Sequence, residues 1–245
     1  MLNSLNGKAV LNVRQINMDE VRKYCTYHMS KGVKLKDYIV TENETSKKFC
    51  IIGIGGGGIN IVEAITKDNG KHFPMLAHID HQELYDRKAD NKFYIMSDLK
   101  DKEILTVENR RALSEFVSAH EEVYIVTTLG RETHRSQAVE KIVQHLHRIH
   151  RKVTLIVVKP FLFEVIPGRI RAINATIKEL EKYVEKIFIF HNEDLLAIKE
   201  SSAMSMPEVF SSLDNIIASV IEEDYECGDE VVNNIYLKEL MNERY

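Results

Sequence analysis

The sequence has few cysteines and no long apolar run, and both absences restrict the class of protein. Three cysteines are spread over 245 residues, so neither a disulfide framework nor a cysteine-based metal site is expected. No stretch approaches the roughly 20 consecutive apolar residues that cross a bilayer. The first ten residues, MLNSLNGKAV, lack the apolar centre of a secretory signal. We therefore expect a cytoplasmic protein without membrane insertion.

A strong excess of either charge is also missing, as are internal repeats and low-complexity segments. The formal net charge is −4 at pH 7, and a field of this sign does not attract nucleic acid or anionic membranes. No nucleic-acid partner is expected for this reason. The apolar content of 44% is enough to bury a sizeable core.

Short apolar runs alternate with helical patterns after residue 48. The runs predict strands at Phe49–Ile54, 75–79, 123–128, 153–158 and 187–190. Helical periodicity lies near 107–118, 136–150 and 172–183, and a longer helical pattern begins at Pro207. This alternation predicts an α/β fold, with helices on both faces of a parallel Rossmann-like sheet.

An additional helix is predicted before this domain. Asn17 and Glu20 have the spacing of a capping box, the helical pattern continues to Lys31, and Gly32 is a typical C-terminal stop. The polar run at 41–48 then indicates a linker.

A glycine run, Gly53-Ile54-Gly55-Gly56-Gly57-Gly58, follows the first main strand and opens a predicted helix near Asn60. Free N–H groups and the helix dipole at such a position attract phosphate. The run also fits GxGxxG, and Asp80 ends the next strand, where a dinucleotide-binding fold has its ribose-binding acid. A Rossmann cofactor site and simple close packing of the helix both remain open at this point.

Later segments resemble one family in their order along the chain. The segment 159–164, KPFLFE, follows a strand and is succeeded by Arg169, a helix, a strand and Asn192. This order resembles FtsZ, the tubulin-like GTPase of bacterial division. GIGGGGIN resembles its first phosphate loop, HIDHQEL its NTDAQAL segment, and FSSLDNII the FGAANDVL stretch of its central helix. The resemblance covers about residues 48–221.

The resemblance implies a guanine-nucleotide site. Its cofactor-binding residues would be Gly55, Gly56, Gly57, Gly58, Asn60, Asp80, Glu164, Arg169, Asn192 and Asn215. The glycines and Asn60 would face the phosphates, and Glu164 and Arg169 the ribose and phosphate side. The two other asparagines would face the base. Arg169 is placed by assuming one inserted residue. Asn215 stands where the family has an aspartate, so selectivity for guanine should weaken.

Two departures bear on nucleotide affinity. The family signature GGGTGTG here reads GRETHRS at 130–136, so four of its five glycines are missing. The side chains of the residues that replace these glycines would occupy the space of the phosphates, although Arg131 and Arg135 could form a different anion site. The segment 96–106 contains no glycine where the family has the loop that senses the γ-phosphate. GTP or GDP binding is therefore expected to be weak.

The set of residues that the family uses for hydrolysis is also incomplete. The family's NVDFADV loop resembles residues 233–239, where Ile235 and Lys238 replace the two acids that orient water. We expect no catalytic residue and no metal cofactor. The expected organisation is an N-terminal extension at 1–47, an FtsZ-like nucleotide-binding domain at 48–221, and a tail at 222–245 in place of the second FtsZ domain.

The function predicted from these features is that of a pseudo-GTPase or weak guanine-nucleotide binder, acting through protein contacts in cell division. Its partner would be a second copy or an FtsZ-type filament protein. Two alternatives remain. One is an active GTPase completed by a partner or by assembly, and the other is an NAD(P)-dependent Rossmann enzyme.

Overall fold

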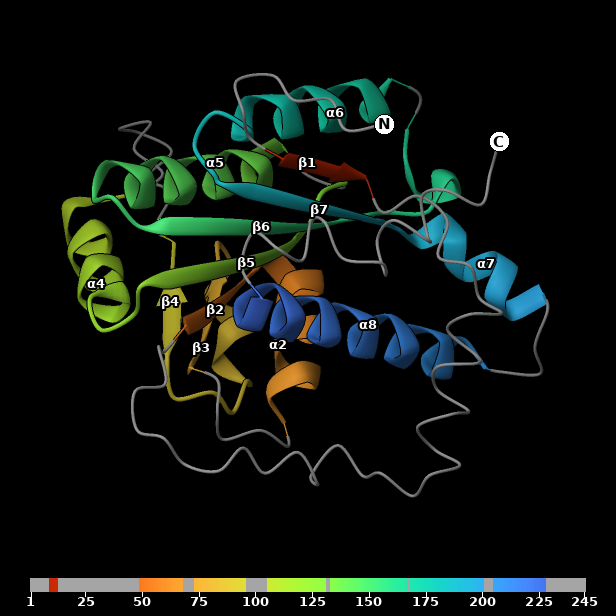
Figure 1. Cartoon of the computed structure of the whole chain (residues 1–245), viewed down its shortest axis with the longest axis horizontal. Coiled ribbons are helices and arrows are strands. Elements are labelled where there is room, and N and C mark those ends of the chain that lie inside the picture. Colours follow the sequence, from red (N-terminus) through yellow and green to blue (C-terminus); the bar gives the residue numbers. More distant parts are fainter. Residues whose placement is uncertain are drawn as a thin grey trace.

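The chain folds around one parallel sheet, as the computed structural model shows for residues 9–12, 49–67, 73–95, 105–130, 133–166, 168–200 and 205–227. The sheet has seven strands in the order β1-β7-β6-β5-β2-β3-β4 (Figure 1). Their bounds are β1 Ala9–Asn12, β2 Phe49–Ile54, β3 Phe73–His78, β4 Lys92–Tyr94, β5 Glu122–Thr128, β6 Lys152–Lys159 and β7 Lys186–His191.

Helices connect the strands and cover both faces. They are α2 Gly55–Thr66, α3 His81–Tyr85, α4 Val107–Val117, α5 Thr133–Arg148, α6 Arg169–Leu180, α7 Asn192–Glu200 and α8 Met206–Cys227, with a 3-10 turn, η2, at Leu162–Glu164. No helix in the described part of the chain is long and apolar enough to cross a membrane.

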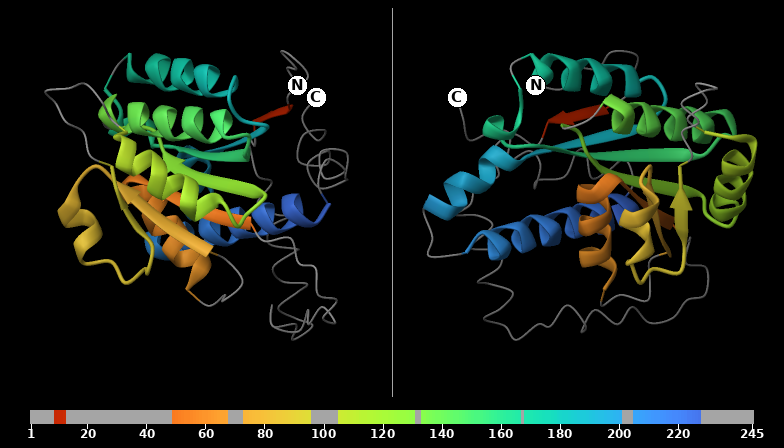
Figure 2. Two further views of the ribbon diagram at one scale, coloured as in Figure 1. Left: turned by 90° about the vertical axis from the view of Figure 1, so that its left-hand side faces the viewer. Right: turned by 180° about the vertical axis from the view of Figure 1, so that it is seen from behind.

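Two apolar cores lie on opposite faces of the sheet because successive strand residues point to opposite sides. Cys50 and Ile52 of β2 pack in the core formed with α4, α5 and α6. Phe49 and Ile51 of the same strand pack in the core formed with α2, α3, α7 and α8. Figure 2 shows these two helix layers on either side of the sheet. The predicted α/β architecture with helices on both faces is confirmed.

The predicted elements after residue 48 have counterparts at nearly the same bounds, because buried parallel strands are continuous apolar runs. The elements β4, α3 and α7 were not predicted from the sequence. Strand β4 has three residues, of which only Phe93 is buried, so neither its length nor its pattern gives a signal. Strand β1, from the segment assigned to the extension, pairs in parallel with β7. The helix predicted at 17–31 lies outside the described residues.

The carboxyl ends of parallel strands meet at one edge of the sheet. Here α2 follows β2, η2 follows β6, and α7 follows β7 directly, so the predicted site segments converge on this edge. Open α/β sheets bind ligands in the crevice outside these strand ends.

Candidate functional site

Three glycines of the β2–α2 loop are explained by backbone shape and packing. Gly55 has φ of +74°, a conformation that residues with a side chain rarely adopt. A Cβ at Gly53 would lie 2.8 Å from the carbonyl oxygen of Gly58. A Cβ at Gly58 would lie 2.3 Å from the carbonyl oxygen of Val126. The loop therefore needs these glycines whether or not it binds a ligand.

The two central glycines differ from each other. A Cβ at Gly57 would lie 2.4 Å from Cγ2 of Thr128 on β5. A Cβ at Gly56 would meet no atom of the described residues within 4 Å, and Gly56 does not have a positive φ. Close packing, the alternative left open by the sequence, accounts for Gly57 and not for Gly56. The space beside Gly56 is open at the start of α2, where N–H groups have no partner within the helix.

Asn60 lies one turn further along α2 and contacts Arg87, which follows the end of α3. Its Oδ1 accepts a hydrogen bond of 2.9 Å from Nη1 of Arg87. The same Nη1 is 2.6 Å from Oε2 of Glu63. The side-chain oxygen of Asn60 is thus bonded to the segment after α3, and its NH₂ group is the part available to a ligand.

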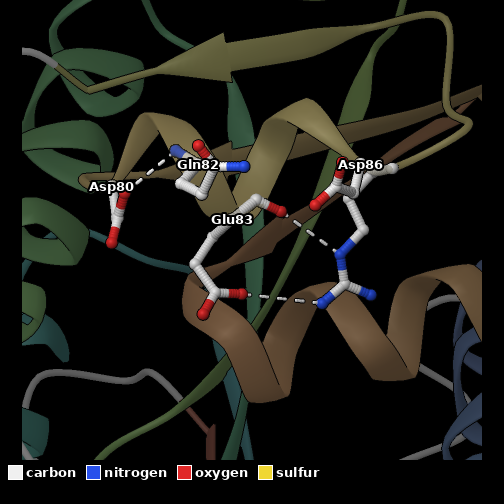
Figure 3. A pocket seen from close by; sticks show the side chains of 5 residues that line it. Asp80, Gln82, Glu83 and Asp86 are labelled. Atoms are coloured by element: carbon white, nitrogen blue, oxygen red, sulfur yellow. Dashed lines mark hydrogen bonds and ion pairs between the residues drawn. The ribbon is translucent and has the colours of Figure 1, made fainter.

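Asp80 begins α3 and lines an open pocket of about 430 Å³ (Figure 3). Its Oδ1 accepts a hydrogen bond of 2.9 Å from the backbone N–H of Gln82 and so caps the helix. Glu83, Asp86 and Arg87 complete the lining. Three carboxylates and one paired guanidinium repel an anion, so the phosphates of a nucleotide would fit the start of α2 better than this pocket.

The KPFLFE segment forms η2, and its acid closes the turn. Oε2 of Glu164 accepts from the N–H of Phe161 at 3.3 Å. A carboxylate oxygen of Glu193 on α7 accepts from the N–H of Leu162. Glu164 therefore lies at the predicted edge of the site, with one carboxylate oxygen committed to the backbone.

Arg169 opens α6 and reaches the loop after β5. Its Nε donates to the carbonyl oxygen of Gly130 at 3.2 Å. A Cβ at Gly130 would lie 2.6 Å from Cγ of Pro160, so this loop is packed closely against the start of the KPFLFE segment. Residues 131 and 132 and the side chains of 133–136 lie outside the described part, and so do 96–104 and 233–239. The predictions made for those segments are not addressed by the structure.

At the other end of the edge, α7 and α8 carry the residues predicted to face the base. Oδ1 of Asn192 is buried and has no hydrogen-bond partner among the described residues. Buried acceptors of this kind are rare. A 180° rotation of the side-chain amide would put its NH₂ group in the place of Oδ1. Asn192 could therefore accept a hydrogen bond from a ligand or donate one to it.

Asn215 is exposed on α8, whereas the neighbouring Asp214 is half-buried. Burial raises the pKa of the Asp214 carboxyl to about 6. Asp214 also lies four residues after Phe210, and such residues share one face of a helix. The Phe210 ring is 6.1 Å from that of Phe161. The structure thus brings Asp214, and not Asn215, to the face of α8 that carries Phe210. The phase of the buried residues Val209 and Leu213 could have revealed this in the sequence.

In the described part of the chain, no group of three or more His, Cys, Asp or Glu side chains is arranged to hold a metal ion.

Comparison with protein-family models gives no match. Among curated proteins, the chain is 27% identical over 187 residues to the cell division protein FtsZ of Buchnera aphidicola subsp. Baizongia pistaciae, covering 70% of this chain and 47% of that protein. It is 26% identical over 189 residues to FtsZ of Helicobacter pylori, covering 71% and 48%. The chain spans about half the length of these curated relatives.

Solved structures give the same fold. An empty FtsZ dimer from M. jannaschii matches with a TM-score of 0.58 at 16% identity, over 87% of this chain and 59% of that one. The GTPγS-bound protofilament of CetZ2 from Haloferax volcanii matches with a TM-score of 0.53 at 17% identity, over 77% and 63%. TubZ from Clostridium botulinum phage c-st matches with 0.52 at 14%, over 73% and 61%. The resemblance first seen in KPFLFE and the glycine run is confirmed.

Proposed function

We propose that this chain, a divergent FtsZ/tubulin-like domain, binds a guanine nucleotide weakly at the carboxyl edge of its sheet and acts through contacts with other proteins. The observation that carries the nucleotide part is the open space beside Gly56 at the start of α2. Its curated relatives are cell division proteins, which supports a role in division or in a related filament system.

The phosphates would lie against the start of α2. The N–H groups there point outward and the helix dipole favours negative charge. Gly130, at the second loop of the family's site, is instead packed against Pro160 and bonded through its carbonyl to Arg169. Each charge-assisted hydrogen bond that this loop no longer makes is worth roughly 1.5–3 kcal/mol, and about 1.4 kcal/mol is tenfold in affinity. Binding in the micromolar range or weaker is therefore proposed.

The base would lie between α7 and α8. A carboxylate accepts two N–H groups at once, which is the pattern that guanine presents. Asp214 supplies such a carboxylate on the same helix face as Phe210, a residue that is 39% exposed and offers an apolar surface. We therefore propose Asp214 as the acidic base contact, beside Asn192, in preference to the exposed Asn215.

Protein contact is supported by an apolar patch next to this site. The patch consists of Leu162, Phe163 and Ile166, which are 58%, 75% and 78% exposed. Phe163 is stacked on Phe161, with ring centroids 5.0 Å apart, so it is held outward by a packed neighbour. Clustered exposed apolar side chains mark interaction sites. The structural relatives include a dimer and a protofilament, which favours a second copy or an FtsZ-type protein as partner.

The absence of efficient hydrolysis is proposed on sequence grounds. Ile235 and Lys238, which lie outside the described residues, stand at the positions where the family has its water-orienting acids. Neither side chain can position water or act as a base there at neutral pH.

Gly56→Val tests the nucleotide site without changing the packing of the loop. We expect a melting temperature close to that of the parent protein and loss of saturable GDP binding in calorimetry, because the branched side chain fills the open space. Ala175→Val is the matched control, since it adds a β-branched residue at an exposed position of α6 and should leave GDP binding unchanged.

Two results would contradict the proposal. Unchanged GDP binding by Gly56→Val would remove the α2 start from the site. No binding of GDP or GTP by the parent protein at millimolar concentration, or saturable binding of NAD, would remove the guanine nucleotide itself.

A further inference from the structure

A buried polar network lies at the end of α8 that is distant from the candidate site. Asp224 is 3% exposed. Its Oδ1 is 2.9 Å from Nζ of Lys186 on β7, and its Oδ2 accepts a hydrogen bond of 3.0 Å from the hydroxyl of Tyr124 on β5. Both carboxylate oxygens are thus bonded to two different strands of the sheet.

Such a network is a weak source of net stability. The Lys186 side chain is only 12% exposed, so both charges have been removed from water. The desolvation cost of a buried ion pair roughly offsets its attraction, and apolar replacements of similar volume are often neutral or stabilising. Buried polar groups can instead select one arrangement among several that would bury the same apolar surface.

The apolar face of α8 does not by itself fix the position of the helix along its axis. Val209, Leu213, Ile217 and Ile221 are all buried, are all aliphatic, and recur every four residues. A shift of α8 by four residues, about 6 Å along its axis and about 40° around it, would put each of the first three in the place of the next. The shift would also put Val220 in the place of Asp224, so that Lys186 and Tyr124 would both lose the carboxylate that they contact.

We propose that the Asp224–Lys186–Tyr124 network fixes the axial register of α8 and thereby positions Phe210 and Asp214 at the carboxyl edge of the sheet. The polar bonds that set the register lie at the Asp224 end of the helix, and the residues that it positions for the ligand lie towards the other end. Ten residues, or about 15 Å of helix, separate Asp224 from Asp214. The consequence for nucleotide binding rests on the proposed function, whereas the register itself does not.

Spin-label distances can report the register directly. Labels are placed on Cys introduced at the exposed positions Ala112 of α4 and Asn215 of α8. Helix α4 lies beyond one end of α8 in Figure 1, so the distance between the labels should change when α8 moves along its axis. Cys25 and Cys227 are replaced by Ser in this background, and Cys50 is buried. The labelled protein with the unmodified network should give one narrow distribution of distances between the two labels.

The decisive variant is Tyr124→Phe/Lys186→Met/Asp224→Leu, which removes all three polar groups at similar volume. We expect a melting temperature within a few degrees of the parent, and a second or broadened distance displaced by up to about 6 Å. In the same variant without labels, the affinity for GDP should fall at least tenfold. The charge-swapped pair Lys186→Glu/Asp224→Lys keeps the ion pair and should retain the single distance.

A single unshifted distance in the triple variant would overturn the proposal, as would a charge-swapped pair that is as heterogeneous as the triple variant. If the triple variant does not fold, Lys186→Met/Asp224→Leu is measured with the same criteria. A shifted distance together with a parent protein that does not bind GDP would uphold the register and overturn the proposed nucleotide function alone.

Discussion

Nε of Arg169 donates a hydrogen bond to the carbonyl oxygen of Gly130 at 3.2 Å, and so ties the start of α6 to the loop after β5. This loop was predicted from the sequence to be the counterpart of the family's glycine signature, and Arg169 was predicted to face the ribose and phosphate side. The bond commits one guanidinium nitrogen to the protein itself. Arg169 therefore acts in the folded protein as a link between two segments of the candidate site.

Loss of this link should affect stability more than nucleotide affinity. For Arg169→Ala we expect a decrease of about 1 kcal/mol in the free energy of unfolding, the usual contribution of one hydrogen bond. GDP affinity should fall much less than in Gly56→Val. Urea denaturation and calorimetry measure the two quantities. A loss of GDP binding with unchanged stability would instead make Arg169 a direct ligand.

Gly56 and Gly57 should respond in opposite ways to the same substitution. Gly57→Ala puts a Cβ 2.4 Å from Cγ2 of Thr128, and such overpacking costs about 1–3 kcal/mol. Gly56→Ala meets open space and should be neutral or slightly stabilising, because alanine favours a helix. Thermal unfolding of the two variants is the measurement. Gly57→Ala/Thr128→Ala should recover part of the loss, and no recovery would speak against the Thr128 contact as its cause.

The stability of the protein should depend on the ionisation of Asp214. Burial raises the pKa of this carboxyl from 3.8 to about 6 in the folded protein, so the folded state binds the proton more tightly than the unfolded chain does. Stability therefore falls as the pH rises from about 4 to about 6 and is constant above that range as far as this group is concerned. Asp214→Asn should remove this dependence and be more stable than the parent at pH 7.5.

Melting temperatures measured from pH 4 to pH 8 test this point. Asn215→Ala is the neighbouring control and should follow the parent's profile, because Asn215 is exposed and does not titrate. GDP affinity should rise through pH 6 in the parent if ionised Asp214 accepts from the base. Parallel profiles for the parent and Asp214→Asn would show that Asp214 is not desolvated as described.

Hydrolysis of GTP by the protein alone should be indistinguishable from background. The reason is that Ile235 and Lys238 are predicted from the sequence to stand where the family has two water-orienting acids, and removing such positioning costs several orders of magnitude in rate. Phosphate release at high protein concentration with magnesium is the assay. Turnover typical of the family would show that the acids are supplied by other residues or by assembly.

The sequence by itself determined the layered α/β architecture. Strands buried on both faces must be continuous apolar runs, so Phe49–Ile54 and its counterparts were visible before any contact was known. The family resemblance was also present in the sequence, because KPFLFE, the glycine run and the final helix keep their order along the chain. These signals are local and do not depend on which distant residues meet.

Only the tertiary structure decided which of these residues are free to bind a ligand. Gly57 is required by Thr128, and Gly130 is packed on Pro160, whereas Gly56 faces open space. Nothing in the run of four glycines at 55–58 distinguishes Gly56 from Gly57. The apolar phase of α8 separates Asp214 from Asn215 in the sequence, but whether Asp214 reaches the other site residues depends on how α8 lies on the sheet. That placement arises from contacts such as Asp224 with Lys186, between residues 38 positions apart, which no pattern of neighbouring residues can reveal.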